Sequence, residues 1–192
     1  MQNTSLPTLD LENKQQTLAY ELIANTNSCF FLTGRAGSGK TTFLHKVQEL
    51  VNKQFLTLAP TGVAAMLAGG DTIHSFFGLP MDVCYPGTMG KMNEARIQTL
   101  LHTDTIIIDE VSMVRCDIID AIDYTMRKTL RSSLPFGGKQ VIFVGDMFQL
   151  PPIVSDDAVL EYLKQEYGGI YFFNSHIIQK ELKNIKLFEL SK

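Results

Sequence analysis

The chain has 192 residues, which is enough for one domain with a full core and too few for two large ones. A hydrophobic content of 45% and a charged content of 19% are ordinary for a globular protein, and no apolar run approaches the ~18 residues of a membrane span. The net charge of −3 argues against a dedicated nucleic-acid module, so any DNA contact must be local or completed by other parts of the protein. The 3 scattered cysteines form no zinc-binding pattern. Reduced thiols, and a polar first segment without a signal peptide, favour an intracellular protein.

The first expected helix follows a short polar segment. Residues 1–10 are expected to form a flexible lead-in, with Asp10 as the N-cap of a helix that continues to Asn25. Gln15 and Gln16 lie on this helix. Taken alone, either glutamine is best interpreted as a solvated helix residue.

A phosphate-binding sequence lies between an expected strand at 29–33 and an expected helix at 42–51. The segment GRAGSGKT, residues 34–41, matches G-x-x-x-x-G-K-[ST]. Its glycines let backbone N–H groups surround a phosphate at the positive end of a helix. Lys40 is expected to reach the β- and γ-phosphates, and Thr41 to offer its hydroxyl to Mg²⁺. The predicted nucleotide-binding residues of this stretch are Gly34, Ala36, Gly37, Ser38, Gly39, Lys40, Thr41 and Thr42.

A second strand, 55–59, runs into Pro60, Thr61 and Gly62, which precede a short helix at 63–68. Thr61 is expected at or near the N-cap of this helix. That arrangement can hold a phosphate of a nucleic-acid backbone, and it is equally compatible with a plain capped helix. Spacing alone does not distinguish the two.

Polar and aromatic side chains are interleaved in the stretch that follows, where His74 and Ser75 precede Phe76. Bases stack on aromatic rings, and these three residues are candidates for contact with a single strand. However, a phenylalanine in a half-buried loop is more often a core residue.

The next two segments carry less information about function. Residues 79–93, with their prolines and glycines, are predicted to form a mobile loop. A short helix at 93–101 is expected to turn Ile97, Leu100 and Leu101 inward.

Two adjacent carboxylates, Asp109 and Glu110, end a β-branched run at 106–108 that is typical of a strand buried on both faces. In an open α/β sheet the ligand crevice lies at the carboxyl end of such a strand. Asp109 is therefore expected to hold Mg²⁺ through its water shell, and Glu110 to polarise the attacking water. The alternative is an acidic turn without a catalytic role.

The second half of the chain continues the alternation of helices and strands. A helix at 117–130 carries Arg127 and Lys128 near its end, where they complement the helix dipole. Gln149 follows a strand at 140–144, and a glutamine there can bind a γ-phosphate and change position when the phosphate leaves. The remaining expected elements are a helix at 156–169 and strands at 170–173 and 185–190. This alternation predicts an α/β fold, with a mostly parallel sheet and helices on both faces.

The ordered motifs together resemble the first motor domain of superfamily-one DNA helicases, in the petite-integration-frequency (Pif-type) branch related to RecD. The resemblance covers about residues 11–190, in the family's order. The segments that carry it are LENKQ at 11–15, APTGVAA at 59–65, TIHSFF at 72–77, DEVSM at 109–113, FGGKQ at 136–140 and GDMFQLPP at 145–152. The helix at 117–127 is similar to the branch's signature helix.

The resemblance implies a RecA-like P-loop NTPase domain over 11–192 that binds ATP and Mg²⁺. It implies that Gln15 reads adenine, that Thr41 and Asp109 hold the metal, and that Lys40, Glu110 and Gln149 are catalytic. The residues implied to contact DNA are Pro60, Thr61, Gly62, His74, Ser75 and Phe76. The implied activity is 5′ to 3′ translocation on single-stranded DNA by a monomer, with forked or structured DNA as a further partner and no membrane. Implied roles are DNA repair, recombination and telomere maintenance. The compartment would be the bacterial cytoplasm and nucleoid, or the eukaryotic nucleus or mitochondrion.

The family's second motor domain, whose arginines complete the ATP site, is expected to follow residue 192. Residues 1–192 are therefore predicted to bind ATP, to hydrolyse it poorly and not to unwind DNA. Two alternatives stay open. One is a protein-coupled P-loop ATPase without a nucleic-acid substrate, which the acidic net charge slightly favours. The other is a nucleotide-regulated scaffold in which Glu110 is idle.

Overall fold

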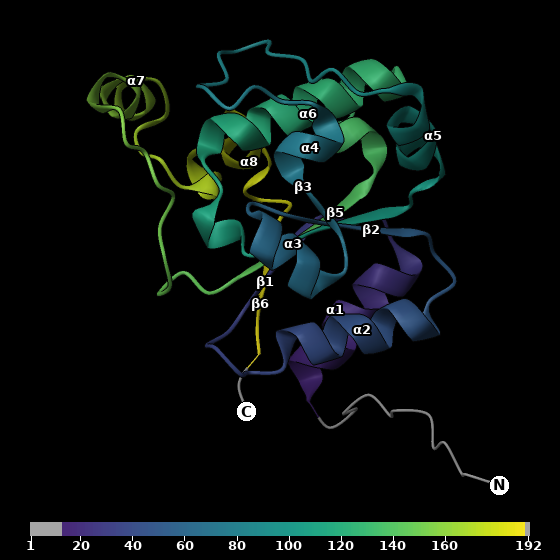
Figure 1. Ribbon diagram of the computed structural model, residues 1–192. Helices are drawn as coiled ribbons and strands as arrows, with labels where there is room; N and C mark the ends of the chain where they lie inside the picture. Colours follow the sequence, from purple (N-terminus) through teal and green to yellow (C-terminus); the bar gives the residue numbers. More distant parts are fainter. Residues whose placement is uncertain (1–12, 191–192) are drawn as a thin grey trace, which may run out of the picture.

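Parallel strands form one sheet in the order β3-β2-β4-β5-β1-β6 in the computed structural model, which describes residues 13–190 (Figure 1). Each neighbouring pair in this order runs parallel. The prediction of a mostly parallel sheet is confirmed. The strands are β1 (Phe30–Thr33), β2 (Phe55–Ala59), β3 (Asp71–Thr72), β4 (Thr105–Ile108), β5 (Gln140–Gly145) and β6 (Lys186–Glu189).

Helices cover both faces of this sheet, as predicted. The connection from β1 to β2 crosses the sheet in one direction, and the connections from β4 to β5 and from β5 to β6 cross it in the other. Because such crossovers are right-handed, their helices fall on opposite faces. One face carries α1 (Lys14–Asn25) and α2 (Lys40–Leu50), and the other carries α4 (Ile73–Phe77), α6 (Cys116–Leu130) and α8 (His176–Glu181) (Figure 1). The remaining helices are α3 (Gly62–Ala68), α5 (Glu94–His102) and α7 (Asp157–Tyr167).

The core is split by the sheet into two layers. Ile106 and Ile108 pack into the layer below α4 and α6, whereas Ile107 packs into the layer below α1 and α2. All residues of β4 and β5 are buried. A continuous apolar sequence therefore suits strands that are covered on both faces. Because β4 and β5 run parallel, the residues that follow them lie at the same edge of the sheet.

The first helix begins later than predicted. It starts at Lys14, and the side chain of Asn13 caps it by accepting the backbone N–H groups of Gln15 (3.1 Å) and Gln16 (3.3 Å). The lead-in predicted at 1–10, with its N-cap at Asp10, lies outside the described residues. By accepting from both groups, Asn13 provides hydrogen-bond partners for two of the unpaired N–H groups at the start of the helix.

The strand predicted at 170–173 is wrong. Tyr171 makes only an isolated antiparallel bridge with Arg115, and Phe172–Asn174 forms a short 3-10 helix, η3. The ring of Phe172 packs on the rings of Phe31 and Phe143, at 5.2 and 5.7 Å between centroids. This aromatic packing places the segment on one face of the sheet, under α6, and not beside a strand.

Two smaller expectations also differ from the structure. Residues 79–93 form a loop, but buried hydrogen bonds anchor it, so the predicted mobility is not supported. Cys84 N–H donates to Asp117 and Gly90 N–H donates to the hydroxyl of Thr125, both at 2.8 Å. In α5, Leu100 is buried as expected, whereas Leu101 is 45% exposed because it lies on the outer face of the helix.

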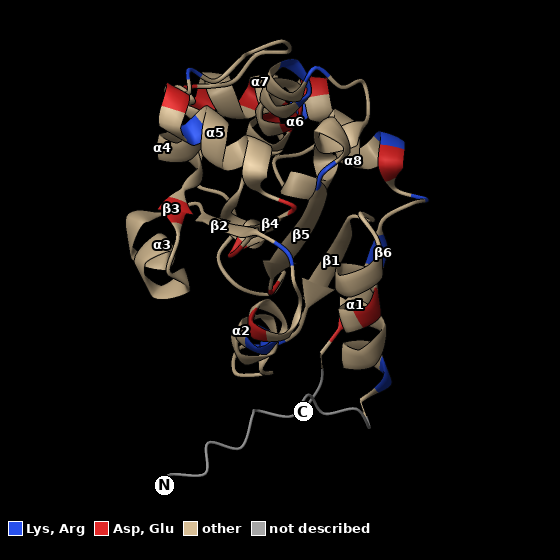
Figure 2. Ribbon diagram, turned by 90° about the vertical axis from the view of Figure 1, so that its right-hand side faces the viewer, with Lys and Arg blue, Asp and Glu red and all other residues tan. Residues whose placement is uncertain are grey.

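Charges are spread over the described surface without a basic face. Figure 2 shows Lys and Arg interspersed with Asp and Glu over the helices. Within residues 13–190, no helix is long and apolar enough to cross a membrane.

Candidate active site

The phosphate-binding loop connects β1 to α2 with the geometry that the motif predicts. Gly39 lies at the N-cap position of α2 in a left-handed conformation (φ 88°), and no side chain caps the helix. A Cβ on Gly34 would lie 2.5 Å from the backbone oxygen of Leu190, so only glycine fits there. Because no side chain caps this 11-residue helix, its first N–H groups can bind an anionic ligand.

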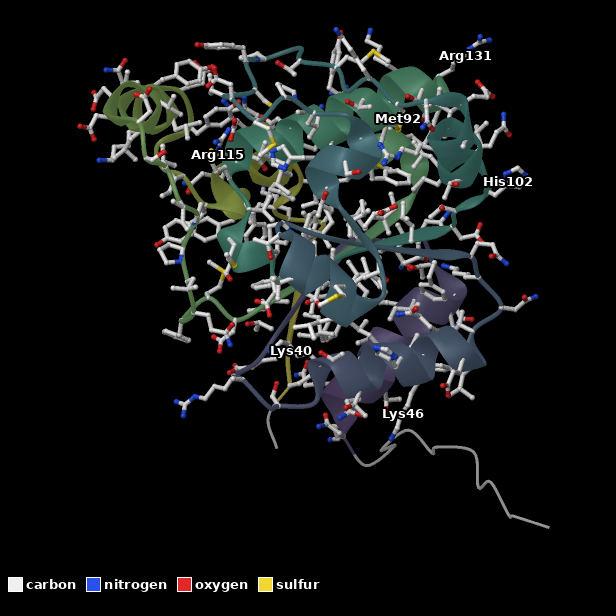
Figure 3. All side chains as sticks on the ribbon, in the orientation of Figure 1. Lys40, Lys46, Met92, His102, Arg115 and Arg131 are labelled. Atoms are coloured by element: carbon white, nitrogen blue, oxygen red, sulfur yellow. The ribbon has the colours of Figure 1, made fainter. Side chains whose placement is uncertain are left out.

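Lys40 is held against its own loop. Its Nζ donates to the backbone oxygens of Gly34 (2.5 Å) and Arg35 (3.3 Å), and Figure 3 shows Lys40 where the loop enters α2. Its charge also acts on Asp109 and Glu110, whose pKa values it lowers in part. The ammonium group is therefore bound to the loop and close enough to both carboxylates to act on them electrostatically, as a residue that contacts the β- and γ-phosphates requires.

A cavity of about 380 Å³ is lined by the start of α2, by α3 with its cap, and by the segments that follow β4 and β5. It brings together four residues that were predicted to form the ATP site from distant parts of the chain: Thr41, Asp109, Glu110 and Gln149. Asp109 N–H donates to the backbone oxygen of Leu58 at 2.8 Å, which places the carboxylates beside the end of β2. The cavity is also lined by Thr61, Val63, Ala64, Leu67, Ala68, Ser112, Met113 and Leu150.

The two carboxylates are in an unfavourable environment for negative charge. Burial raises the pKa of Asp109, while the N–H of Glu110, which donates to Asp109 Oδ1 at 2.9 Å, and the charge of Lys40 lower it. Burial also raises the pKa of Glu110, and the negative charges of Asp109 and Asp146 raise it further. A divalent cation relieves such crowding, and a carboxylate with a raised pKa is suited to general-base catalysis.

Glu110 is also held in a special backbone conformation. It lies in the left-handed region (φ 50°, ψ 40°) at the start of the 3-10 turn η1 (Val111–Met113). A non-glycine residue there carries a modest conformational cost that the surrounding structure must offset, and such residues cluster at functional sites. The turn redirects the chain away from β4 at the point where the carboxylate enters the cavity.

Asp146 is part of the site although sequence reasoning did not select it. It is 6% exposed, and its Oδ1 accepts the N–H of Phe148 at 3.0 Å while its backbone oxygen accepts the N–H of Gln149 at 3.0 Å. This turn places Gln149 at the cavity. The available signal was an aspartate directly after the buried strand β5, the same pattern that identified Asp109 after β4.

A smaller cavity of about 160 Å³ lies next to the first and shares Thr61 and Met113 with it. Pro60, Thr61 and His74, all predicted to contact DNA, line this second cavity. Its other lining residues are Ile73, Val114, Arg115, Ile118 and Ile153. The structure therefore places residues that were predicted to contact DNA beside residues that were predicted to bind ATP.

The predicted role of Phe76 in stacking on a base is wrong for this structure. Phe76 is 2% exposed and packs edge-on against Phe77, with ring centroids 5.1 Å apart. The short helix α4 turns both rings into the core, so neither offers a free face. Ser75 is exposed, but its hydroxyl accepts from Arg96 at 2.7 Å and its backbone oxygen also accepts from Arg96.

Arg115 forms one wall of the second cavity and was also missed. Its guanidinium holds Asp117 in a two-point contact, Nε to Oδ1 at 2.9 Å and Nη2 to Oδ2 at 2.7 Å, and donates to the backbone oxygen of Asp82. Figure 3 shows it near the start of α6. Burial lowers the pKa of His74, and the charge of Arg115 lowers it further, so the imidazole is neutral at physiological pH.

Besides Ser75 and Phe76, nine predicted residues line neither cavity: Gln15, Gly34, Ala36, Gly37, Ser38, Gly39, Lys40, Thr42 and Gly62. Gln15 is exposed on α1, which packs beside α2, while Gly62 is the first residue of α3 and Thr42 is exposed in the first turn of α2. Thr61 caps α3 by accepting the N–H of Ala64 at 3.2 Å, which confirms the predicted cap. Its hydroxyl is therefore occupied within the protein.

The residues present fit a nucleoside triphosphate with Mg²⁺. An uncapped helix end and Lys40 suit the phosphates, and oxygen donors from Thr41 and Asp109 suit a hard cation. A phosphate-binding loop between a strand and a helix, with paired carboxylates at the end of a parallel strand, defines a P-loop nucleoside-triphosphatase domain.

The model of PIF1-like helicases matches residues 10–189, and the chain belongs to the PIF1-like helicase family. ATP-dependent DNA helicase PIF1 of Danio rerio is 36% identical over 159 residues, covering 77% of this chain and 24% of that protein. ATP-dependent DNA helicase Pif1 of Bdellovibrio bacteriovorus is 36% identical over 155 residues, covering 77% and 35%. Pif1 helicase from Bacteroides, solved in complex with ADP-AlF3 and ssDNA, aligns with a TM-score of 0.84 at 42% identity. That alignment covers 93% of this chain and 42% of the solved one.

These alignments confirm the predicted family and the RecA-like fold. The chain spans between 24% and 35% of the length of the two curated relatives. The activity of the relatives as whole proteins is therefore only a basis for a proposal about this chain. The residues of this chain must support that proposal.

Proposed function

We propose that this chain is an ATP-binding motor domain of a DNA helicase that moves 5′ to 3′ on single-stranded DNA. The observation that carries the proposal is the pair of adjoining cavities. One is lined by Thr41, Asp109, Glu110 and Gln149, the other by Pro60, His74 and Arg115, and both by Thr61. A site for nucleotide chemistry therefore adjoins the motifs proposed to contact DNA.

The chain's residues have distinct roles in this proposal. The N–H groups at the start of α2 and the ammonium of Lys40 bind the phosphates, and Gln15 reads the adenine. Thr41 and Asp109 hold Mg²⁺, which when bound neutralises the charge that develops on the phosphates. Glu110 takes a proton from the attacking water, and its raised pKa suits that task. Gln149 contacts the γ-phosphate and shifts when it leaves.

Coupling to DNA runs through elements that border both cavities. Thr61 caps α3, so a movement at the nucleotide side of α3 also moves Pro60 and Gly62. On the opposite wall, the short turn η1 connects Glu110 to Arg115 within the same stretch of chain. Thr61, His74 and the backbone around Gly62 are proposed to contact the single strand.

The proposed partners are single-stranded DNA and forked or structured DNA. The described residues that line the nucleotide cavity include no arginine. Because an arginine from a second domain contributes about 10³–10⁵-fold in related chemistry, the chain alone is proposed to bind ATP and turn it over slowly, without unwinding. The protein is proposed to act as a monomer inside the cell, where its DNA lies. That place is the nucleoid of a bacterium, or the nucleus or mitochondrion of a eukaryote, with roles in repair, recombination and telomere maintenance.

The test is the ATPase rate of the chain, and of any longer protein that contains it, with and without an oligo-dT strand. We expect the longer protein's rate to rise strongly with the oligonucleotide. Glu110→Gln should lower the stimulated rate by about 10²–10⁴-fold and leave ATP binding intact. A rate that DNA does not change would favour the protein-coupled ATPase. The net charge of −3 is also more compatible with that alternative. Unchanged turnover in Glu110→Gln would favour a nucleotide-regulated scaffold.

A further inference from the structure

Ser112 occupies a fixed place beside the nucleotide cavity. It is the middle residue of η1, two positions after Glu110, and it lines the cavity. Hydrogen bonds from Met113 N–H to Glu110 (3.0 Å) and from Val114 N–H to Val111 (3.0 Å) close the turn. The turn packs on the end of β5 so closely that a Cβ on Gly145 would lie 3.3 Å from the backbone nitrogen of Ser112.

The hydroxyl of Ser112 is buried and has no partner. Ser112 is 1% exposed, and its Oγ is one of four buried side-chain atoms without a hydrogen bond among the described residues. The others are Ser38 Oγ, Arg127 Nε and Tyr167 Oη. A buried polar group without a partner is destabilising, and native structures contain few. Two of these four atoms are serine hydroxyls in the segments that form the ATP site.

The surroundings of Ser112 suggest what completes its hydrogen bonding. A cavity that also holds Asp109 and Glu110 has an excess of acceptors, and a hydroxyl can both donate and accept. Ser112 lines the same cavity as Glu110, which is proposed to activate the attacking water, and follows it by two residues in the same turn. Ser38, by contrast, belongs to the phosphate-binding loop, which is proposed to surround the phosphates that ADP and ATP have in common.

We propose that Ser112 is a binding residue for the γ-phosphate end of the nucleotide, where its hydroxyl pairs with an oxygen of the γ-phosphate or of the water that Glu110 activates. This inference rests on the proposed function. The hydroxyl has no partner within the described protein, and a bound triphosphate would supply one. The residue is thus expected to favour triphosphate over diphosphate.

The test uses the purified chain, with thermal unfolding and equilibrium binding measured for MgADP and MgATPγS. Ser112→Ala should keep the unfolding midpoint of the free protein unchanged or raise it, by up to about 4 °C, because no hydrogen bond is lost. It should weaken MgATPγS binding about 10-fold and leave MgADP binding unchanged. Ser112→Cys, which keeps the shape of the side chain with a slightly larger atom and a weak hydrogen-bond donor, should weaken MgATPγS binding in the same way.

Ser175→Ala is the matched control. Ser175 is also fully buried, but its hydroxyl accepts the N–H of Ile178 at 3.3 Å as the cap of α8. This variant should lower the free protein's midpoint by about 2–4 °C and leave both nucleotide affinities unchanged. Ser38→Ala should weaken MgADP and MgATPγS alike.

The results that overturn the inference are distinct from those that overturn the proposed function. If Ser112→Ala lowers the midpoint as Ser175→Ala does and binds MgATPγS normally, the hydroxyl is structural. If it weakens MgADP and MgATPγS equally, its assignment to the γ-phosphate end is wrong. If the wild-type chain binds neither nucleotide, the proposed function fails, and the inference fails with it.

Discussion

The two adjoining cavities differ in how far the protein satisfies its own polar groups. In the nucleotide cavity, burial raises the pKa values of Asp109 and Glu110, and the hydroxyl of Ser112 has no partner. In the second cavity, Arg115 is paired with Asp117 and the hydroxyl of Thr61 caps α3. The nucleotide cavity thus contains carboxylates whose charge is disfavoured and a hydroxyl without a partner, whereas Arg115 and Thr61 of the second cavity have partners within the protein.

This difference indicates how each cavity is suited to its proposed ligand. A site with crowded carboxylates and an uncapped helix end gains from a cation and an anion together, as Mg²⁺ with a triphosphate provides. Among the described residues that line the second cavity, Arg115 is the one arginine, and because it already holds Asp117, little positive charge is left there for a phosphate backbone. DNA binding there is proposed to rest on shape and backbone contacts, and a net charge of −3 is compatible with that.

The largest effect is expected from Lys40→Ala, which removes the ammonium group of the phosphate-binding loop. Lys40 donates only to carbonyls of its own loop in the free protein, so the fold should remain. Loss of a charged contact to phosphate should weaken MgATPγS binding at least about 10-fold. The measurement is isothermal titration against Lys186→Ala, because Lys186 is an exposed lysine at the start of β6, at the end of the strands opposite the loop. Equal affinities in the two variants would contradict the loop's assignment.

Arg115→Gln tests the second cavity. The carboxylate of Asp117 is fully buried, and removing its cation should cost about 3–5 kcal/mol of unfolding free energy. Urea unfolding measures this loss. Arg127→Gln is the matched control, because Arg127 is 38% exposed where it holds Asp123, and a smaller loss is expected.

A second readout of Arg115→Gln is independent of stability. The variant should raise the pKa of His74, because a neighbouring positive charge is gone while burial and the negative charge of Asp117 remain. An NMR titration of the imidazole detects the change. A His74 pKa that does not move would show that the two residues are not coupled across the cavity.

Thr61→Ala addresses the residue common to both cavities. Loss of the cap on α3 should cost about 1 kcal/mol of unfolding free energy. If Thr61 also couples the cavities, DNA-stimulated ATPase should fall further than in Thr72→Ala, which removes the corresponding cap of α4, where Thr72 accepts the N–H of Ser75. Equal effects of the two variants would leave Thr61 with a capping role alone.

The smallest effect is the pH dependence that Glu110 adds to stability. Below its ordinary pKa of 4.5 the residue is protonated in both the folded and unfolded states. As pH rises through the raised pKa of the folded state, ionisation costs stability, because the unfolded state loses its proton more readily. Glu110→Gln should therefore be more stable than wild type at neutral pH, and the difference should shrink toward pH 4.5. A constant difference at all pH values would contradict the raised pKa.

Most of the nucleotide site could be predicted from the sequence, because its residues follow buried strands or a glycine-rich loop. Asp109 and Glu110 end a β-branched run, and Lys40 lies in a motif whose spacing defines its geometry. Asp146 has the same pattern after β5 and was nevertheless missed. The second cavity could be predicted only in part, since Thr61 follows a strand but Arg115 faces its partner through tertiary packing.

The sequence by itself determined most of the order of elements, the parallel sheet and the place of the proposed nucleotide site. Local periodicity selects helix or strand, and right-handed crossovers then bring the strand ends to one edge. Only the tertiary structure decided that Phe76 is core, that residues 172–174 form a turn, and that Ser112 has no partner. Each of these depends on which neighbours arrive from distant segments, and hydrophobic periodicity does not encode those neighbours. The phosphate-binding loop can be recognised from its own eight residues, whereas the surface proposed to bind DNA can be identified only from the complete fold.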